Sequence, residues 1–175
     1  MNTYVGIDLS LVATGIVAVG FGELQRTIRT TPETKFPERL SIISDAIEDV
    51  IMTAQPEVIA MESVAMMGTR DLKLPMVHGA VLMGLHRQGI RTPLYVAPAT
   101  LKKFATGRGN GEKSDVKMFV FQKWGVMLSD NNQADAYVLA KIAQAIGDPE
   151  LPWLKYEQEC VDTILTSPLN GGPKR

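Results

Sequence analysis

Cysteine is nearly absent from this chain, and long hydrophobic runs are absent altogether. Cys160 is the single cysteine among 175 residues, which excludes an internal disulfide framework and fits a reducing compartment. No apolar run reaches the length needed to span a bilayer, and the first residues lack the basic stretch and apolar core of a secretory signal. We therefore expect a cytoplasmic protein.

Neither sign of charge is in excess. The net charge of −1, with 21% charged and 45% apolar residues, is typical of a folded domain and excludes an intrinsically disordered chain. The basic residues are unevenly spread, because five of them fall between positions 102 and 117 against two acids. Such a run is either a solvated face or the basic surface of a binding site. These residues are Lys102, Lys103, Arg108, Lys113 and Lys117.

Hydrophobic patterning predicts a single α/β domain over residues 1–166, followed by a flexible tail rich in Pro and Gly over 167–175. Short connections between the first three strands favour an antiparallel meander, and the helix before the fourth strand favours parallel pairing. The expected strands span 3–8, 14–19, 25–30, 57–62 and 93–97. The expected helices span 37–55, 75–88, 98–104, 112–123, 132–146 and 155–165.

The helix expected over 75–88 is apolar around nearly its whole circumference. A helix of this kind must be buried on more than one side. One side can pack on the sheet, and the other either on a second subunit or on loops of the same chain. Ala80 and Gly84 would permit a close approach to whatever covers them.

Carboxylates stand where three separate elements converge. Asp8 ends the first strand, Glu62 ends the fourth, and Asp135 lies in the first turn of the 132–146 helix, with Asp130 just before it. Burying a carboxylate is costly unless a partner satisfies it. Turn amides for Asp8 and a helix-capping role for Asp130 are the structural alternatives to a metal site.

The chemistry of this carboxylate set favours a hard divalent cation. Oxygen ligands with no histidine nearby select Mg²⁺ or Mn²⁺ over Zn²⁺. Two such ions, about 3.5–4 Å apart, suit hydrolysis of a phosphodiester.

Four motifs, in this order and spacing, resemble the RuvC family of Holliday-junction resolvases, with the phage-encoded branch nearest in length. They are GIDLSLVATG, the Ile-Ala-Met-Glu-Ser strand end, GNGEKSDVK and NNQADAYVLA, and the resemblance covers residues 3–147. It implies an α/β, RNase H-like fold: a mixed five-stranded sheet flanked by helices on both faces. It also implies a homodimer, with the 75–88 helix at the interface, that cleaves four-way DNA by two-metal-ion hydrolysis in the cytoplasm, which is the host's if a phage encodes it.

The resemblance also implies roles for individual residues. Asp8, Glu62 and Asp135 match the family's metal ligands. Asp130 is the candidate fourth ligand, because Asn132 stands where the family often has an acid or histidine. Lys102 and Lys113 match lysines that contact phosphates, and we expect Lys113 to act in catalysis as well. Lys103 and Arg108 are expected to extend the DNA-binding surface.

One departure from the family leaves the substrate range open. Cellular members carry an aromatic residue shortly after the glutamate, whereas Ala65, Met66 and Met67 stand here. A broad branched-DNA endonuclease without strict junction specificity is therefore the first alternative. A non-catalytic branched-DNA binding protein is the second. The third is an ATPase of the sugar-kinase and Hsp70 class, whose phosphate loop also begins with an aspartate on a strand, but which normally needs two lobes and a longer chain.

Overall fold

Five strands form one mixed sheet in the computed structural model, which describes residues 2–20, 24–64, 72–108 and 113–172, except for the side chains of 113–115. The strand order is β3-β2-β1-β4-β5, with β1, β2 and β3 antiparallel and β4 and β5 parallel to β1. This arrangement confirms the predicted mixed sheet. The strands are β1 (Thr3–Asp8), β2 (Ala13–Gly20), β3 (Leu24–Arg29), β4 (Val58–Glu62) and β5 (Leu94–Val96).

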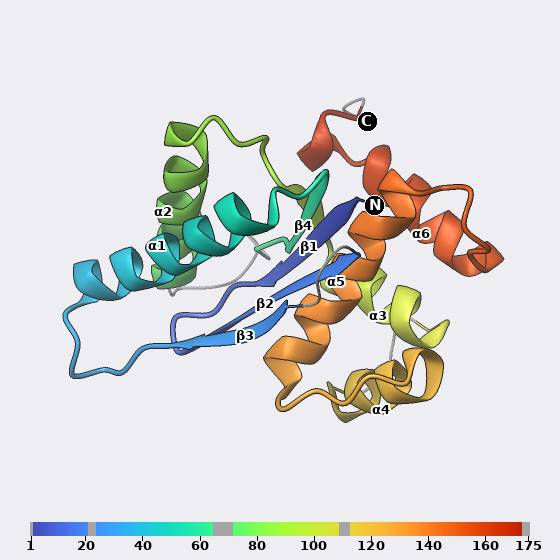
Figure 1. The fold of residues 1–175 in the computed structure, drawn as a ribbon, viewed down its shortest axis with the longest axis horizontal. Coiled ribbons are helices and arrows are strands. Elements are labelled where there is room, and N and C mark those ends of the chain that lie inside the picture. The colour runs from blue at the N-terminus through green and yellow to red at the C-terminus, as the bar shows by residue number, and fades with distance from the viewer. Residues whose placement is uncertain (1, 21–23, 65–71, 109–112, 173–175) are drawn as a thin grey trace.

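Helices cover both faces of the sheet, as predicted. Figure 1 shows α1 and α2 on one face and α3 to α6 on the other. Alternation along β1 divides the core, because Val5 and Ile7 pack on the α1 side while Tyr4 packs on the α5 side. The helices are α1 (Phe36–Ala54), α2 (Lys73–Arg87), α3 (Pro98–Thr106), α4 (Lys113–Trp124), α5 (Asn131–Gly147) and α6 (Lys155–Leu165). No helix of the described residues is long and apolar enough to cross a membrane.

The central helix α5 lies directly on the backbone of β1 and β2, because two strand glycines leave room for it. A Cβ added at Gly6 would stand 2.0 Å from the carbonyl oxygen of Ala136, and one at Gly15 would stand 2.1 Å from that of Asn132. The helix therefore begins over the carboxyl end of β1 and runs back towards its start. These two contacts set how closely α5 approaches the sheet and in which direction the helix runs.

The surroundings of α2 differ from the sequence-based expectation. The helix begins at Lys73, before Pro75, since proline is tolerated in a first helical turn. A Cβ at Gly84 would meet Glu48 and Ser44, so this glycine serves the packing of α2 on α1 within the protomer. The opposite side of α2 is exposed: Leu72, Met76 and Met83 keep 70%, 51% and 51% of their surface accessible. Within the described part of one protomer, one face of this helix is buried and the other is exposed.

Part of the segment expected to be a flexible tail is ordered. Pro168–Asn170 forms a 3₁₀ turn, η1, beside the edge strand β5. The Asn170 side chain accepts a hydrogen bond from the Tyr95 amide at 2.7 Å and donates one to the Tyr95 carbonyl at 2.9 Å. The carboxamide thereby satisfies both backbone groups that an edge strand leaves open. Residues 173–175 of the expected tail lie outside the described residues, and the boundary at residue 166 stays a prediction.

Replacing Gly6 with Ala should destabilise the protein by about 1–3 kcal/mol or more, since the new Cβ meets helix backbone that cannot rotate away. Urea unfolding followed by circular dichroism measures this loss. Gly79→Ala is the matched control, because no atom lies within 4 Å of a Cβ there and alanine is the better helix former. Equal stability of Gly6→Ala and wild type would contradict the close packing of α5.

Candidate functional site

The sheet register places Asp8 and Glu62 side by side. Ile7 of β1 pairs with Met61 of β4 in parallel, so the next residue of each strand stands at the shared carboxyl edge. Alternation puts Asp8 on the same face as Tyr4 and Glu62 on the same face as Ala60, and both of those residues pack on the α5 side. Two carboxylates from neighbouring strands thus point towards the start of α5.

The first turns of α5 bring Asp135 to the same place. Asp135 lies between Asn132, which rests on Gly15, and Ala136, which rests on Gly6. Gly15 is itself the antiparallel partner of Asp8. The three carboxylates of Asp8, Glu62 and Asp135 accordingly line one small pocket of about 130 Å³. The sequence-based prediction that three separate elements deliver them to one point agrees with this geometry.

The donor set of this pocket fits a hard divalent cation, because every candidate ligand is a carboxylate oxygen. Among the described residues, no three His, Cys, Asp or Glu side chains are arranged as a complete metal site. The carboxylates therefore share a pocket, while their present positions do not amount to a finished coordination sphere.

Lys102 is the predicted DNA-binding residue that lines the carboxylate pocket. The amide of Ser63 donates to the carbonyl of Val96 at 2.8 Å, which extends the pairing of β4 and β5 beyond Glu62. Pro98 then starts α3 next to the carboxylates, and Lys102 follows one turn later. The short β5–α3 connection is therefore what brings this lysine to the site.

Two other predicted DNA-binding residues, Lys103 and Arg108, are not among the described residues that line the pocket. Lys103 donates to Glu159 of α6 at 2.9 Å, and this hydrogen bond raises the pKa of Lys103. Both side chains are partly exposed, so the pair is weak enough for a phosphate to compete with it. Arg108 is exposed at the end of α3. Lys113 is the first residue of α4, but its side chain and residues 109–112 lie outside the described part.

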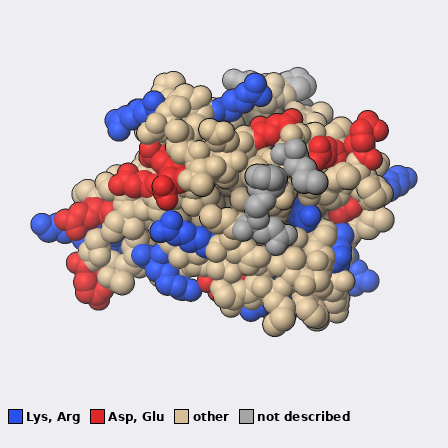
Figure 2. All heavy atoms as spheres, viewed as in Figure 1, with Lys and Arg blue, Asp and Glu red and all other residues tan. Residues whose placement is uncertain are grey.

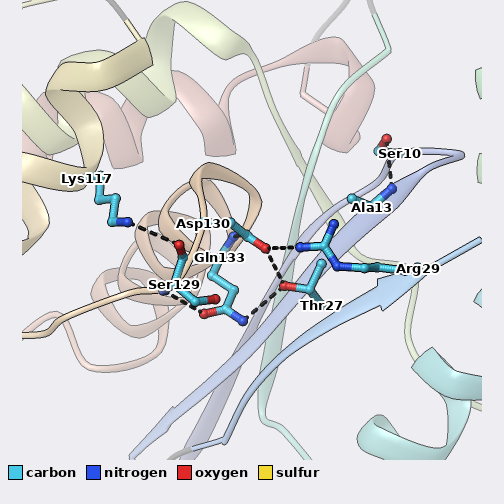
Figure 3. Close-up of polar contacts among 8 residues, drawn as sticks. All are labelled: Ser10, Ala13, Thr27, Arg29, Lys117, Ser129, Asp130 and Gln133. Carbon is cyan, nitrogen blue, oxygen red and sulfur yellow. Dashed lines mark hydrogen bonds and ion pairs between the residues drawn. The ribbon is translucent and has the colours of Figure 1, made fainter.

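Asp130 does not line the pocket with the other three acids. It is the N-cap of α5, and its Oδ1 accepts a hydrogen bond from the Gln133 amide at 2.9 Å. Its Oδ2 accepts from Thr27 and from Arg29, each at 2.9 Å (Figure 3). The structure thus places Asp130 in the capping position that the sequence left open as the alternative to a metal ligand.

Sequence reasoning missed the apolar wall of the pocket and the partners of Asp130. Pro98, Leu101 and Val116 line the pocket from α3 and α4. Thr27 and Arg29 lie on β3, about a hundred positions away from Asp130 in the sequence. No local pattern encodes a contact of that separation. The one local signal was the helical spacing of Leu101 from the apolar residues that follow it in α3. That spacing could have indicated that its side chain points towards the core.

Comparison with known proteins agrees with this architecture. The family model described as "Crossover junction endodeoxyribonuclease RuvC" matches residues 5–146. The RuvC of Zymomonas mobilis is 32% identical over 148 residues, covering 78% of this chain and 87% of that protein. The RuvC of Parvibaculum lavamentivorans is 31% identical over 147 residues, covering 79% and 83% respectively.

Two solved structures share the fold. The RuvC of Thermus thermophilus superposes with a TM-score of 0.66 at 24% identity, covering 79% of this chain and 90% of that one. The same protein in complex with a Holliday junction substrate gives 0.68 at 23% identity, covering 80% and 91%. At these identities the structural likeness confirms the RNase H-like fold, and the family match carries the assignment. The chain belongs to the RuvC family of crossover junction endodeoxyribonucleases.

Proposed function

We propose that this protein cleaves Holliday junctions by metal-assisted hydrolysis of phosphodiester bonds. The observation that carries the proposal is the pocket in which Asp8, Glu62 and Asp135 meet beside Lys102. RuvC enzymes are metal-dependent nucleases, and one structural relative was solved with a Holliday junction substrate. DNA as substrate is consistent with the expected cytoplasmic location, and the phage origin stays a prediction.

The three pocket carboxylates are the residues that would hold the metal. Mg²⁺ or Mn²⁺ fits their oxygen atoms, and we propose two ions per site. When bound, such ions supply an activated water and stabilise charge on the leaving 3′ oxygen. Without them, three acids in one pocket would repel the DNA phosphate, so the carboxylates couple substrate access to metal binding.

Basic side chains would bind the DNA backbone beside the three carboxylates. Lys102 would contact a phosphate next to the scissile bond, because it lines the same pocket. Lys103 and Arg108 would hold the backbone further along α3. Lys113 starts α4, whose Val116 also lines the pocket, so we propose that it reaches the reacting phosphate. On the face shown in Figure 2, basic and acidic side chains are interspersed, so recognition would rest on local contacts.

A homodimer would cover the exposed face of α2. Leu72, Met76 and Met83 recur at helical spacing on the side of α2 that faces away from α1. Exposed apolar residues that align on one helix face are typical of a protein interface. Two pockets in one dimer would also permit paired incision of two strands of a junction.

A broad branched-DNA endonuclease is the alternative that the residues leave open. Ala65, Met66 and Met67, which stand in place of the family's aromatic residue, lie outside the described residues. The pocket of three carboxylates favours catalysis over a purely binding role. An ATPase of the sugar-kinase class is disfavoured, since the family match spans residues 5–146 in one domain.

Asp8→Asn, Glu62→Gln and Asp135→Asn should each lower cleavage of a synthetic four-way junction by about a hundredfold or more, because several kcal/mol of metal-supplied stabilisation is lost. Junction binding should be unchanged or tighter, since each change removes a negative charge near the phosphates. Gel cleavage with Mg²⁺ and with EDTA, against linear duplex as control, measures this. Wild-type cleavage of linear duplex and junction at equal rates would instead favour a non-selective nuclease.

Lys102→Ala should weaken binding to all DNA and reduce the slope of log affinity against log salt by about 0.9, the value for one phosphate contact. Lys113→Ala should have this effect and should also lower the single-turnover cleavage rate at saturating protein, because a cation near developing charge stabilises the transition state. Lys35→Ala, an exposed lysine before α1 on the opposite face, is the control. An unchanged single-turnover rate would limit Lys113 to binding.

Met76→Glu and Met83→Glu should each convert the dimer to monomer, because an unpaired charge would be buried at the interface. Light scattering at micromolar concentration should give wild type about twice the 19.1 kDa chain mass. Leu165→Glu is the matched control: this leucine of α6 is 47% exposed, and α6 lies on the other face of the sheet from α2. A monomeric wild type would contradict the proposal that α2 forms a dimer interface.

A further inference from the structure

The carboxylate of Asp130 is held by more partners than a helix cap requires. A cap needs one oxygen, and Oδ1 supplies it to the Gln133 amide. The second oxygen accepts hydrogen bonds from the Thr27 hydroxyl and the Arg29 guanidinium of β3, each at 2.9 Å (Figure 3). Both oxygens of Asp130 are therefore engaged with protein groups.

Gln133 of α5 adds a second link to β3 and a link to the residue before Asp130. Its side-chain amide donates to Thr27 Oγ1 at 3.0 Å, and its carbonyl oxygen accepts from the Ser129 amide at 3.3 Å. The carbonyl of Ser129 in turn accepts a hydrogen bond from Lys117 Nζ of α4 at 3.2 Å (Figure 3). The start of α5 is thus fastened to β3 on one side and to α4 on the other.

Global stability does not explain the Arg29 contact. The Arg29 side chain is 64% exposed, and exposed ion pairs add little to the free energy of folding. The helix cap does not need this ion pair, because an uncharged serine or asparagine caps a helix as well as aspartate does. The contact with Arg29 joins the N-cap of α5 to β3, and Asp135 lies in the first turns of that helix.

We propose that Arg29 and Asp130 are a positioning pair that sets the place of Asp135 in the carboxylate pocket. Asp130 acts through α5 and not as a metal ligand. This inference rests on the proposed function, in which Asp135 holds the metal. Misplacement of one ligand by a fraction of an ångström lowers metal affinity, as loss of an outer-shell partner does elsewhere.

Direct Mn²⁺ binding to the DNA-free protein tests the pair without relying on cleavage. By calorimetry, Arg29→Met, Asp130→Asn and Asp130→Ser should each raise the Mn²⁺ dissociation constant by about tenfold, within the range known for outer-shell partners. The double variant Arg29→Met/Asp130→Asn should bind no more weakly than either single one, because both changes break one contact. Arg29→Lys should restore part of the affinity. The Mg²⁺ midpoint of single-turnover cleavage should shift in parallel.

Arg26→Met is the matched control, since it removes an exposed arginine of the same strand that alternation directs to the other face. It should leave Mn²⁺ affinity unchanged. Thermal melts separate positioning from a purely structural role: a lowered melting temperature with unchanged Mn²⁺ affinity overturns the proposal. Loss of Mn²⁺ binding in Asp130→Asn alone, with Arg29→Met like wild type, makes Asp130 a ligand and also overturns it. Absence of Mn²⁺ binding by wild type would overturn the proposed function itself.

Discussion

The contact of α5 with the bare backbone of β1 and β2 is the constraint on which the rest of the site depends. Gly6 and Gly15 let helix carbonyls approach to distances that no other residue would allow. Because α5 begins over the carboxyl end of β1, its first turns meet the residue that ends that strand, which is Asp8. The carboxylate pocket is thus a consequence of where α5 lies on the sheet, and Figure 1 shows that helix against the strands.

The electrostatics of the pocket follow from the same geometry. Three acids gather at the amino-terminal end of α5, where the helix dipole partly offsets their mutual repulsion. Lys102 adds a positive charge from α3, and the rest of the compensation is assigned to the metal in our proposal. Outside the pocket the basic residues slightly outnumber the acidic ones, so the net charge of the whole chain is only −1. A near-neutral total therefore does not argue against DNA as substrate, because binding would depend on a few well-placed cations.

Local signals made most of the fold predictable from the sequence, and non-local contacts account for what was not. Hydrophobic patterning indicates where the elements lie, and the predicted strand 3–8 and helix 155–165 agree with the structure residue for residue. Asp8 and Glu62 were identifiable because each ends an apolar strand. Nothing local indicated that Gly84 faces α1 or that Asn170 satisfies Tyr95. The partners of Asp130 on β3 were likewise out of reach, since that contact exists only once the sheet is assembled.

The C-terminal helix α6 supports the basic helices from outside the span that the family model matches, which ends at residue 146. Glu157 is almost fully buried and pairs with Lys123 of α4, whose ammonium also lies 4.7 Å from the ring of Trp124. A buried charge without its partner is strongly destabilising, so this pair holds α4 to α6 in one arrangement. Lys103 binds Glu159 of the same helix. Helices α3 and α4 are therefore both anchored to α6, so the placement of Lys102 on α3 depends on contacts with a segment beyond the span that the family model matches.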